Sequence, residues 1–174
     1  MENEKYKYQG KYIQVSEVSK DGQLWEKVYL CNGIVIYPIT DKNEVLLVQE
    51  YRPHETPNVR LKPVTGIYED EYSMEENAQR EMQEEIGFKA AKIQKVLYTK
   101  SSGTVNNSQY FVIATGLETS KIPNPDGEHT IEKIIAVPIK ELYQKLMDGS
   151  IPLSGVYLGL LKYLNTTHRD LIFS

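Results

Sequence analysis

The sequence is poor in the features that mark several protein classes. Its 174 residues include a single cysteine, Cys31, so an internal disulfide framework is excluded. No apolar run approaches the roughly 18 residues that a membrane-spanning helix needs. The first ten residues also lack the apolar core of a signal peptide. We therefore expect a cytoplasmic protein that does not enter a membrane.

An excess of basic residues is also missing. The chain carries 20 Lys and Arg against 24 Asp and Glu, a formal net charge of −4. Nucleic-acid binding usually requires a basic surface that neutralises phosphates, so we expect no nucleic-acid partner. Apolar residues make up 40%, which is ordinary for a chain with a packed core. The length predicts one domain over residues 1–174.

The chain shows the periodicities of both strands and helices. Residues 6–19, a turn signal at Asp21-Gly22 and residues 24–30 predict an N-terminal antiparallel β-hairpin. Further strands are predicted at residues 33–39, 44–50, 93–98, 109–115 and 131–137, and helices at residues 73–87, 140–147 and 154–165. Pro53, Pro57 and Pro63 indicate a loop. This mixture predicts an α+β fold in which a mixed sheet packs against helices.

The helix expected at residues 73–87 has the clearest signature. Ser73 and Glu76 fit a capping box, and Gly87 is placed to end the helix. Three apolar residues spaced by four form an arc that can pack against the sheet: Ala78, Met82 and Ile86. The capping and the apolar arc together predict a helix that packs one face against the sheet.

Three glutamates lie together at the edge of this apolar arc, namely Glu81, Glu84 and Glu85. Like charges one turn apart destabilise a bare helix by about 0.2–0.5 kcal/mol. Arg80 can reach Glu84, but one arginine does not neutralise three acids. A divalent cation would, because Mg²⁺ is held by a few carboxylates together with substrate phosphate oxygens. The helix alone leaves a solvated acidic face open as the alternative.

This helix also carries a family motif. Gly66, followed at the family's spacing by Arg80-Glu-Met-Gln-Glu-Glu-Ile-Gly-Phe88, resembles the Nudix box G-x5-E-x7-R-E-U-x-E-E-x-G-U, in which U is a bulky apolar residue. The box covers residues 66–88. The resemblance implies the Nudix fold, a mixed β-sheet sandwiched between α-helices. It also implies Mg²⁺-dependent hydrolysis of a diphosphate, with Mn²⁺ as the alternative ion. Tyr72 stands where the motif has its first Glu. Glu71 and Glu69 are neighbouring acids, and Glu71 could compensate.

Segments outside the box resemble ADP-ribose pyrophosphatases and related nucleoside-diphosphate-sugar hydrolases. These segments are residues 24–28, 48–53, 61–66 and 101–103. The resemblance implies metal ligation by the carboxylates of Glu81 and Glu85, with help from Glu84, and by the carbonyl of Thr65. It further implies that Arg52 binds the substrate phosphates, for which a surface salt bridge is the alternative. Trp25 and Glu26 would contact adenine, often from the second subunit, and a core or interface role for Trp25 is the alternative.

The general base is expected in the loop of residues 123–130, where such pyrophosphatases carry a catalytic Glu. Glu128 is the choice, Glu132 is the second choice, and His129 could also serve because its ordinary pKa is near 6.5. An exposed polar loop without a catalytic role is the alternative. Glu84 is the second residue to which we assign a catalytic role.

The resemblance implies an enzyme that hydrolyses ADP-ribose or a related nucleoside diphosphate sugar to a nucleoside monophosphate and a sugar phosphate. Lys62 and Asn107, like Tyr72, stand where relatives often carry Glu. These losses leave open a weak or inactive nucleotide-sugar binding protein, or a Nudix hydrolase of another nucleotide. A homodimer is expected, with residues 1–31 at its interface, because a lone hairpin cannot bury both faces and relatives exchange this element.

Overall fold

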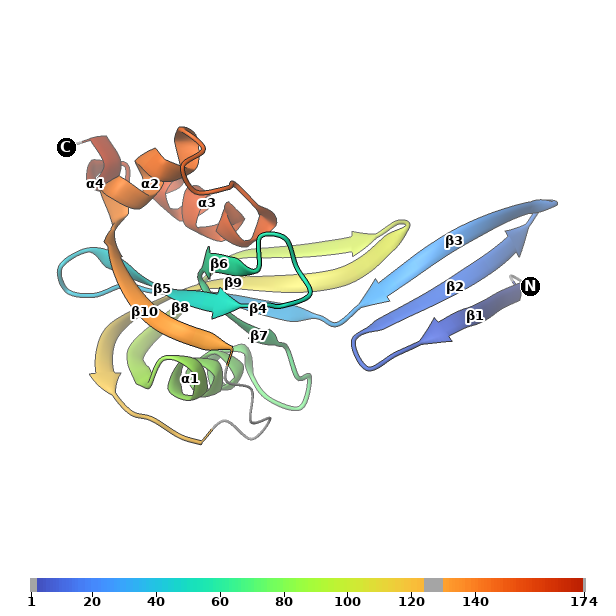
Figure 1. The fold of residues 1–174 in the computed structure, drawn as a ribbon, viewed down its shortest axis with the longest axis horizontal. Coiled ribbons are helices and arrows are strands. Elements are labelled where there is room, and N and C mark those ends of the chain that lie inside the picture. Colours follow the sequence, from blue (N-terminus) through green and yellow to red (C-terminus); the bar gives the residue numbers. More distant parts are fainter. Residues whose placement is uncertain (1–2, 124–129, 174) are drawn as a thin grey trace.

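The computed structural model describes residues 3–123 and 130–173, which form two β-sheets and a set of helices (Figure 1). The strands are β1 (Asn3–Gln9), β2 (Ile13–Lys20), β3 (Gln23–Leu30), β4 (Gly33–Pro38), β5 (Glu44–Tyr51), β6 (Val59–Lys62), β7 (Val64–Ile67), β8 (Phe88–Ser102), β9 (Val105–Thr119) and β10 (Ile131–Pro138). The helices are α1 (Met74–Glu85), α2 (Ile139–Met147), the 3₁₀ helix η1 (Gly155–Tyr157), α3 (Leu158–Thr166) and α4 (Asp170–Phe173). The seven-stranded sheet runs β1-β2-β3-β9-β4-β7 with β8 beside β9, and the other runs β10-β5-β6.

The sheets lie between two helical layers, with α1 on one side and α2, α3 and α4 on the other (Figure 1). Side chains of β4 alternate between the two cores, as a strand buried on both faces requires. Val35 and Tyr37 pack into the core shared with α2 and α3. Ile34 and Ile36 pack into the core shared with α1. The predicted α+β fold with a mixed sheet between helices is therefore confirmed.

The N-terminal strands form a three-stranded antiparallel sheet, which is larger than the predicted hairpin. The predicted strand at residues 6–19 is two strands, because the chain reverses at Gly10, whose N–H donates to the Ile13 carbonyl at 2.9 Å. β3 continues this sheet into the body through two parallel pairs with β9 at Val28 and Tyr29. The three strands extend away from the helical body (Figure 1).

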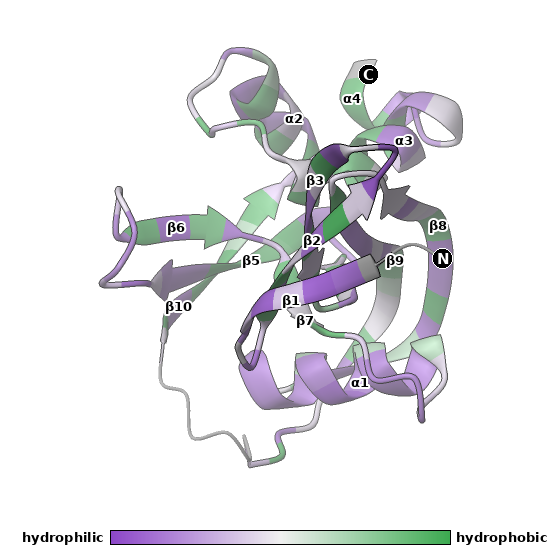
Figure 2. Cartoon of the chain, turned by 90° about the vertical axis from the view of Figure 1, so that its right-hand side faces the viewer, coloured by the Kyte–Doolittle hydropathy of each residue, from purple (hydrophilic) through white to green (hydrophobic). Residues whose placement is uncertain are grey.

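Helix α1 begins and ends as its sequence predicts. Ser73 is the N-cap, and its side chain and that of Glu76 make the reciprocal hydrogen bonds of a capping box. Gly87 ends the helix with a φ of +74°, a conformation that costs glycine little. The three residues of the apolar arc, Ala78, Met82 and Ile86, are at most 4% exposed. The outer face is hydrophilic, as Figure 2 shows.

Two short strands lie where the prolines indicated a loop. β6 and β7 flank Pro63, so the ring sits at the break between two ladders and no ladder hydrogen bond is lost. The hairpin of β8 and β9 is also longer than the predicted strands at residues 93–98 and 109–115. Within residues 3–123 and 130–173, no helix has the length and apolar character needed to cross a membrane.

Candidate active site

A pocket of about 630 Å³ lies where α1, the ends of β5, β6 and β7 and the N-terminal sheet approach one another. Helix α1 contributes Arg80, Glu81, Glu84 and Glu85 to its wall. The strands opposite contribute Glu50, Arg52, Lys62, Thr65, Gly66 and Ile67. The remaining lining residues are Lys11, Tyr12, Glu69, Thr130 and Ile131. All six residues predicted from the Nudix box and its flanking loops therefore meet in one place, namely Arg52, Thr65, Gly66, Glu81, Glu84 and Glu85.

Glu81 projects over β7, and a glycine makes this possible. A Cβ atom at Gly66 would overlap the Glu81 carboxylate, so any larger residue at position 66 would displace it. The Glu81 side chain is 14% exposed. Burial, followed by the negative charges of Glu85 and Glu84, raises the pKa of Glu81 to about 8. The protein alone therefore does not supply enough positive charge to keep this carboxylate ionised at neutral pH.

Glu85 lies deeper in the pocket. Burial raises the pKa of Glu85 to about 7, although the charge of Lys62 and a hydrogen bond from the Thr65 backbone favour the ionised form. Its Oε2 atom is buried and has no hydrogen-bond partner among residues 3–123 and 130–173. A buried carboxylate oxygen without a partner is costly. Such an atom fits a ligand that the polypeptide does not itself provide.

Arg80 is held by the loop that precedes α1. Its guanidinium forms a two-point ion pair with Glu69 at 2.9 Å and stacks 4.9 Å from the Tyr72 ring centroid. Asn77 is fully buried, and its side chain hydrogen-bonds the backbone of Glu69, Tyr72 and Ser73. The expectation that Glu71 compensates for Tyr72 is therefore wrong, because the acid that reaches Arg80 is Glu69.

Arg80 also extends toward the helix acids, at 4.0 Å from Glu81 and 3.9 Å from Glu84. The predicted contact between Arg80 and Glu84 is present, but it is a long ion pair. The guanidinium is directed mainly at Glu69, so within residues 3–123 and 130–173 it compensates the charge of Glu81 only weakly. The predicted excess of acid over base on this helix face is thus seen in the structure.

On the opposite side of the pocket, two cations surround an acid that no sequence motif singles out. Glu50 is 3% exposed, and Arg52 donates to both of its carboxylate oxygens at 2.9 and 3.0 Å. Lys62 lies 3.5 Å from Glu50 and donates to the Thr65 hydroxyl at 2.6 Å. Arg52 thus lines the pocket and forms a salt bridge, but with a buried carboxylate and not at the surface as the alternative had it. The only hint of Glu50 in the sequence was its place in a mostly apolar strand, where a buried acid needs partners.

Trp25 and Glu26 do not line this pocket. Both lie on β3 in the N-terminal sheet, and Trp25 is 56% exposed. A core role for Trp25 within this chain is therefore wrong. A role in adenine binding from a second subunit stays a prediction.

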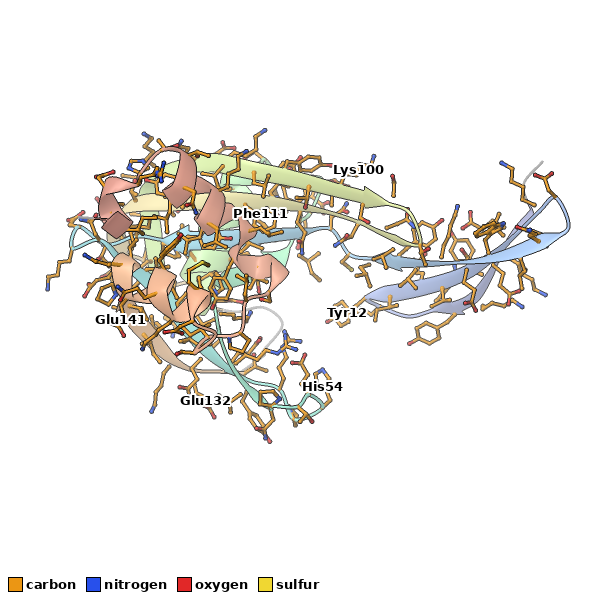
Figure 3. The ribbon with its side chains drawn as sticks, turned by 90° about the horizontal axis from the view of Figure 1, so that it is seen from above. Tyr12, His54, Lys100, Phe111, Glu132 and Glu141 are labelled. Atoms are coloured by element: carbon orange, nitrogen blue, oxygen red, sulfur yellow. The ribbon has the colours of Figure 1, made fainter. Side chains whose placement is uncertain are left out.

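The N-terminal sheet reaches the pocket through other residues. Lys11 and Tyr12, in the turn between β1 and β2, form part of its lining. Figure 3 shows Tyr12 at the end of this sheet that lies nearer the body. The Lys11 ammonium lies 4.9 Å from the Tyr12 ring centroid. No pattern in the sequence points to these residues, because their contact with the pocket depends on how the N-terminal sheet is oriented.

The predicted general base cannot be placed. Glu128 and His129 lie outside the described residues, but Thr130 and Ile131, which directly follow them, line the pocket. Glu132 is exposed and accepts a hydrogen bond from Gln49 at 2.7 Å. It does not line the pocket, and it lies on β10, which pairs with β5 (Figure 3). The structure thus disfavours Glu132 as the base.

The residues of the pocket suit a hard divalent cation. Carboxylate and carbonyl oxygens are the ligands that Mg²⁺ prefers, and Glu81, Glu85 and Thr65 offer both kinds. The unpartnered Glu85 oxygen supports this fit. Over the described ranges, no three acidic, histidine or cysteine side chains form a ready-made metal-binding group. Substrate oxygens and water would therefore complete the coordination, as is usual for Mg²⁺.

Comparisons with known proteins agree with this geometry. The sequence profile of the NUDIX domain matches residues 30–154, and no curated protein matches the sequence. Among solved structures, a protein described as an ADP compounds hydrolase is similar in fold, with a TM-score of 0.77 and 18% sequence identity. The match covers 96% of this chain and 94% of that chain. The chain therefore belongs to the NUDIX domain family, whose members generally use divalent metal ions.

Proposed function

We propose that the protein hydrolyses the diphosphate of ADP-ribose or a related nucleoside diphosphate sugar in a Mg²⁺-dependent reaction. The products would be a nucleoside monophosphate and a sugar phosphate. The observation that carries the proposal is the pairing of two buried, uncompensated carboxylates, Glu81 and Glu85, with the guanidinium of Arg52 across one pocket. The description of the similar structure as an ADP compounds hydrolase agrees with this substrate class.

The helix acids would hold the cation. Glu81 and Glu85 would be ligands, Glu84 would assist them, and Thr65 would contribute its backbone carbonyl. When bound, Mg²⁺ neutralises the diphosphate and lowers the pKa of an attacking water. Because the carboxylates already lie on one rigid helix, their relative position requires no rearrangement of the backbone.

The strand residues would bind and orient the substrate. Arg52 presents a planar guanidinium that can contact phosphate oxygens at two points while it stays anchored by Glu50. We keep Glu128 as the group that orients or deprotonates the water, since residues directly after it line the pocket. Trp25 would stack on the base, and Glu26 would contact it, from the N-terminal sheet of a second subunit.

We also propose that the protein is a cytoplasmic homodimer and that residues 1–31 form its interface. The N-terminal sheet extends from the body and exposes large apolar side chains, among them Tyr8, Leu24 and Trp25, which are 56–61% exposed. A second copy could cover them and bring Trp25 to the partner's pocket. Light scattering should give twice the 20.0 kDa mass of one chain. A mass of one chain at micromolar concentration would exclude the dimer.

The activity can be tested with a panel of nucleoside diphosphate sugars, with and without Mg²⁺. Added phosphatase converts the phosphomonoester products into measurable phosphate. We expect Mg²⁺-dependent release from ADP-ribose or a close relative, and its loss in Glu85→Gln. Glu75→Gln is the matched control, because Glu75 is an exposed acid in the first turn of the same helix. Full turnover by Glu85→Gln would exclude this mechanism.

A second candidate function is nucleotide-sugar binding without cleavage. The observation that favours it is Lys62, which places a positive charge beside Glu50 and Glu85 where relatives often carry an acid. Calorimetry with ADP-ribose, followed by analysis of the recovered ligand, separates the two functions. Tight binding with intact ligand, in the presence of Mg²⁺, would favour the binding protein.

A further inference from the structure

Lys62 is a buried cation inside an acidic pocket. The residue is 8% exposed, and its ammonium nitrogen lies 2.6 Å from the Thr65 hydroxyl and 3.5 Å from Glu50 Oε2. Lysine is rarely buried unless its charge is compensated. The charge of Lys62 also acts on the Glu85 carboxylate. The ammonium therefore contacts Glu50 and Thr65 and acts electrostatically on Glu85, and these residues offer the oxygen atoms that a divalent cation would otherwise attract.

The two sides of the pocket differ in how much positive charge the chain itself provides. Around Glu50, Lys62 and Arg52 supply two cations within 3.5 Å. Around Glu81, the ion pair found within residues 3–123 and 130–173 is a long one of 4.0 Å to Arg80, which is directed mainly at Glu69. A metal ion would thus be needed on the helix side but would be repelled by Lys62 on the strand side.

We propose that the Lys62 ammonium replaces a metal ion on the strand side of the pocket and binds a phosphoryl oxygen of the substrate directly. The ammonium has three N–H donors. Thr65 and Glu50 engage two of them, which leaves one that can face the pocket. The pocket then takes one metal ion, held by the glutamates of α1. This inference rests on the proposed function for the identity of its substrate, but its metal-binding part does not require turnover.

The test compares Lys62→Glu, Lys62→Met and the unmodified chain. Mn²⁺ binding is counted by electron paramagnetic resonance, and ADP-ribose binding is measured by calorimetry in EDTA. We expect one Mn²⁺ per chain for the unmodified protein and for Lys62→Met, and two for Lys62→Glu, which places a carboxylate beside Glu50. In EDTA, Lys62→Met should weaken ADP-ribose binding about tenfold or more, as loss of a charged hydrogen bond does. Lys89→Met, at an exposed lysine of β8, is the matched control.

Two Mn²⁺ ions in the unmodified protein would overturn the proposal, and so would unchanged ADP-ribose binding by Lys62→Met. If Lys62→Glu does not fold, Lys62→Met decides, because unchanged ADP-ribose binding in EDTA by that variant equally overturns the proposal. Failure here is distinct from failure of the proposed function. Hydrolysis by a protein that binds two Mn²⁺ ions would support the proposed function and reject the role of Lys62. One bound Mn²⁺ without hydrolysis would agree with the role of Lys62 and reject the proposed function.

Discussion

The two sides of the pocket hold buried carboxylates in opposite electrostatic states. On the strand side, burial would raise the pKa of Glu50, but hydrogen bonds and charge from Arg52 and Lys62 outweigh it and hold the pKa below its ordinary value. On the helix side, burial and neighbouring acids raise the pKa of Glu81 to about 8. An acid that the chain compensates stabilises the fold, whereas an acid that it leaves uncompensated is available to a ligand.

Replacing Glu81 should have the largest effect on activity. Glu81→Gln removes a metal ligand, and we expect kcat/KM to fall about 100-fold or more, the scale of losing a major electrostatic contribution to catalysis. In the metal-free protein above pH 8, where Glu81 is ionised, the thermal midpoint should stay level or rise, because a buried and repelled charge is removed. Steady-state kinetics and thermal melts measure both quantities, with Glu75→Gln as control. A lower midpoint in Glu81→Gln would show that the chain compensates this carboxylate after all.

Replacing Glu50 should have the opposite profile. Glu50→Gln leaves Arg52 and Lys62 without their shared anion in a buried position, and we expect the free energy of unfolding to fall by about 3 kcal/mol. Denaturation by urea measures the change. Glu141→Gln is the control, because Glu141 forms an exposed i,i+4 pair with Lys145 on α2. Equal urea midpoints for Glu50→Gln and Glu141→Gln would show that the buried Glu50 carboxylate stabilises the fold no more than an exposed one.

The two sides of the pocket were not equally predictable from the sequence. The difference depends on how far apart in the sequence the interacting residues lie. Helix α1 was predicted with its cap, its end at Gly87 and its apolar arc, since these depend on residues within a few positions of one another. The strand side depends on the pairing of β5 with β6 and β10, which brings together residues that are distant in the sequence. No local sequence pattern around Glu50, Arg52 or Lys62 predicts that these three side chains form a buried ion-pair cluster.

The loop before α1 shows the same limit on a smaller scale. The sequence has two acids near Tyr72, Glu69 and Glu71, and Glu71 was expected to compensate, but which of them reaches Arg80 depends on how the loop turns. Asn77 decides it, because its four hydrogen bonds to the loop backbone place Glu69 at Arg80. The motif indicates that an acid belongs at or near position 72, but it does not show which neighbouring acid lies beside Arg80. The fold family was predictable for the opposite reason, because its motif fixes many residues at set spacings.

Stability should depend on pH through the helix side. Folding raises the pKa of Glu81 to about 8 and that of Glu85 to about 7 from an ordinary 4.5, so the folded chain binds more protons than the unfolded chain in this range. The free energy of unfolding of the metal-free protein should therefore fall as pH rises from about 5 to 8. Melts in EDTA should show this fall.

Added Mg²⁺ should reverse the loss. The ion binds deprotonated carboxylates, so the rise in thermal midpoint on adding Mg²⁺ should be larger at pH 8 than at pH 6. The double variant Glu81→Gln, Glu85→Gln serves as control, and in it both the slope with pH and the Mg²⁺ effect should shrink. If the double variant keeps the slope, other groups cause it and the helix acids are already compensated.

The ion pair between Glu69 and Arg80 should contribute least, although its geometry is good. Glu69 is 41% exposed at its side chain, so water competes with Arg80 for the carboxylate. A double-mutant cycle of Glu69→Gln and Arg80→Met should give a coupling free energy of about 0.5–1 kcal/mol, the scale of partly exposed pairs. The same cycle between Glu50→Gln and Arg52→Met should give a clearly larger value, because Glu50 is 3% exposed. Similar couplings would mean that burial does not distinguish the two sides, and that Glu69 contributes to the fold as Glu50 does.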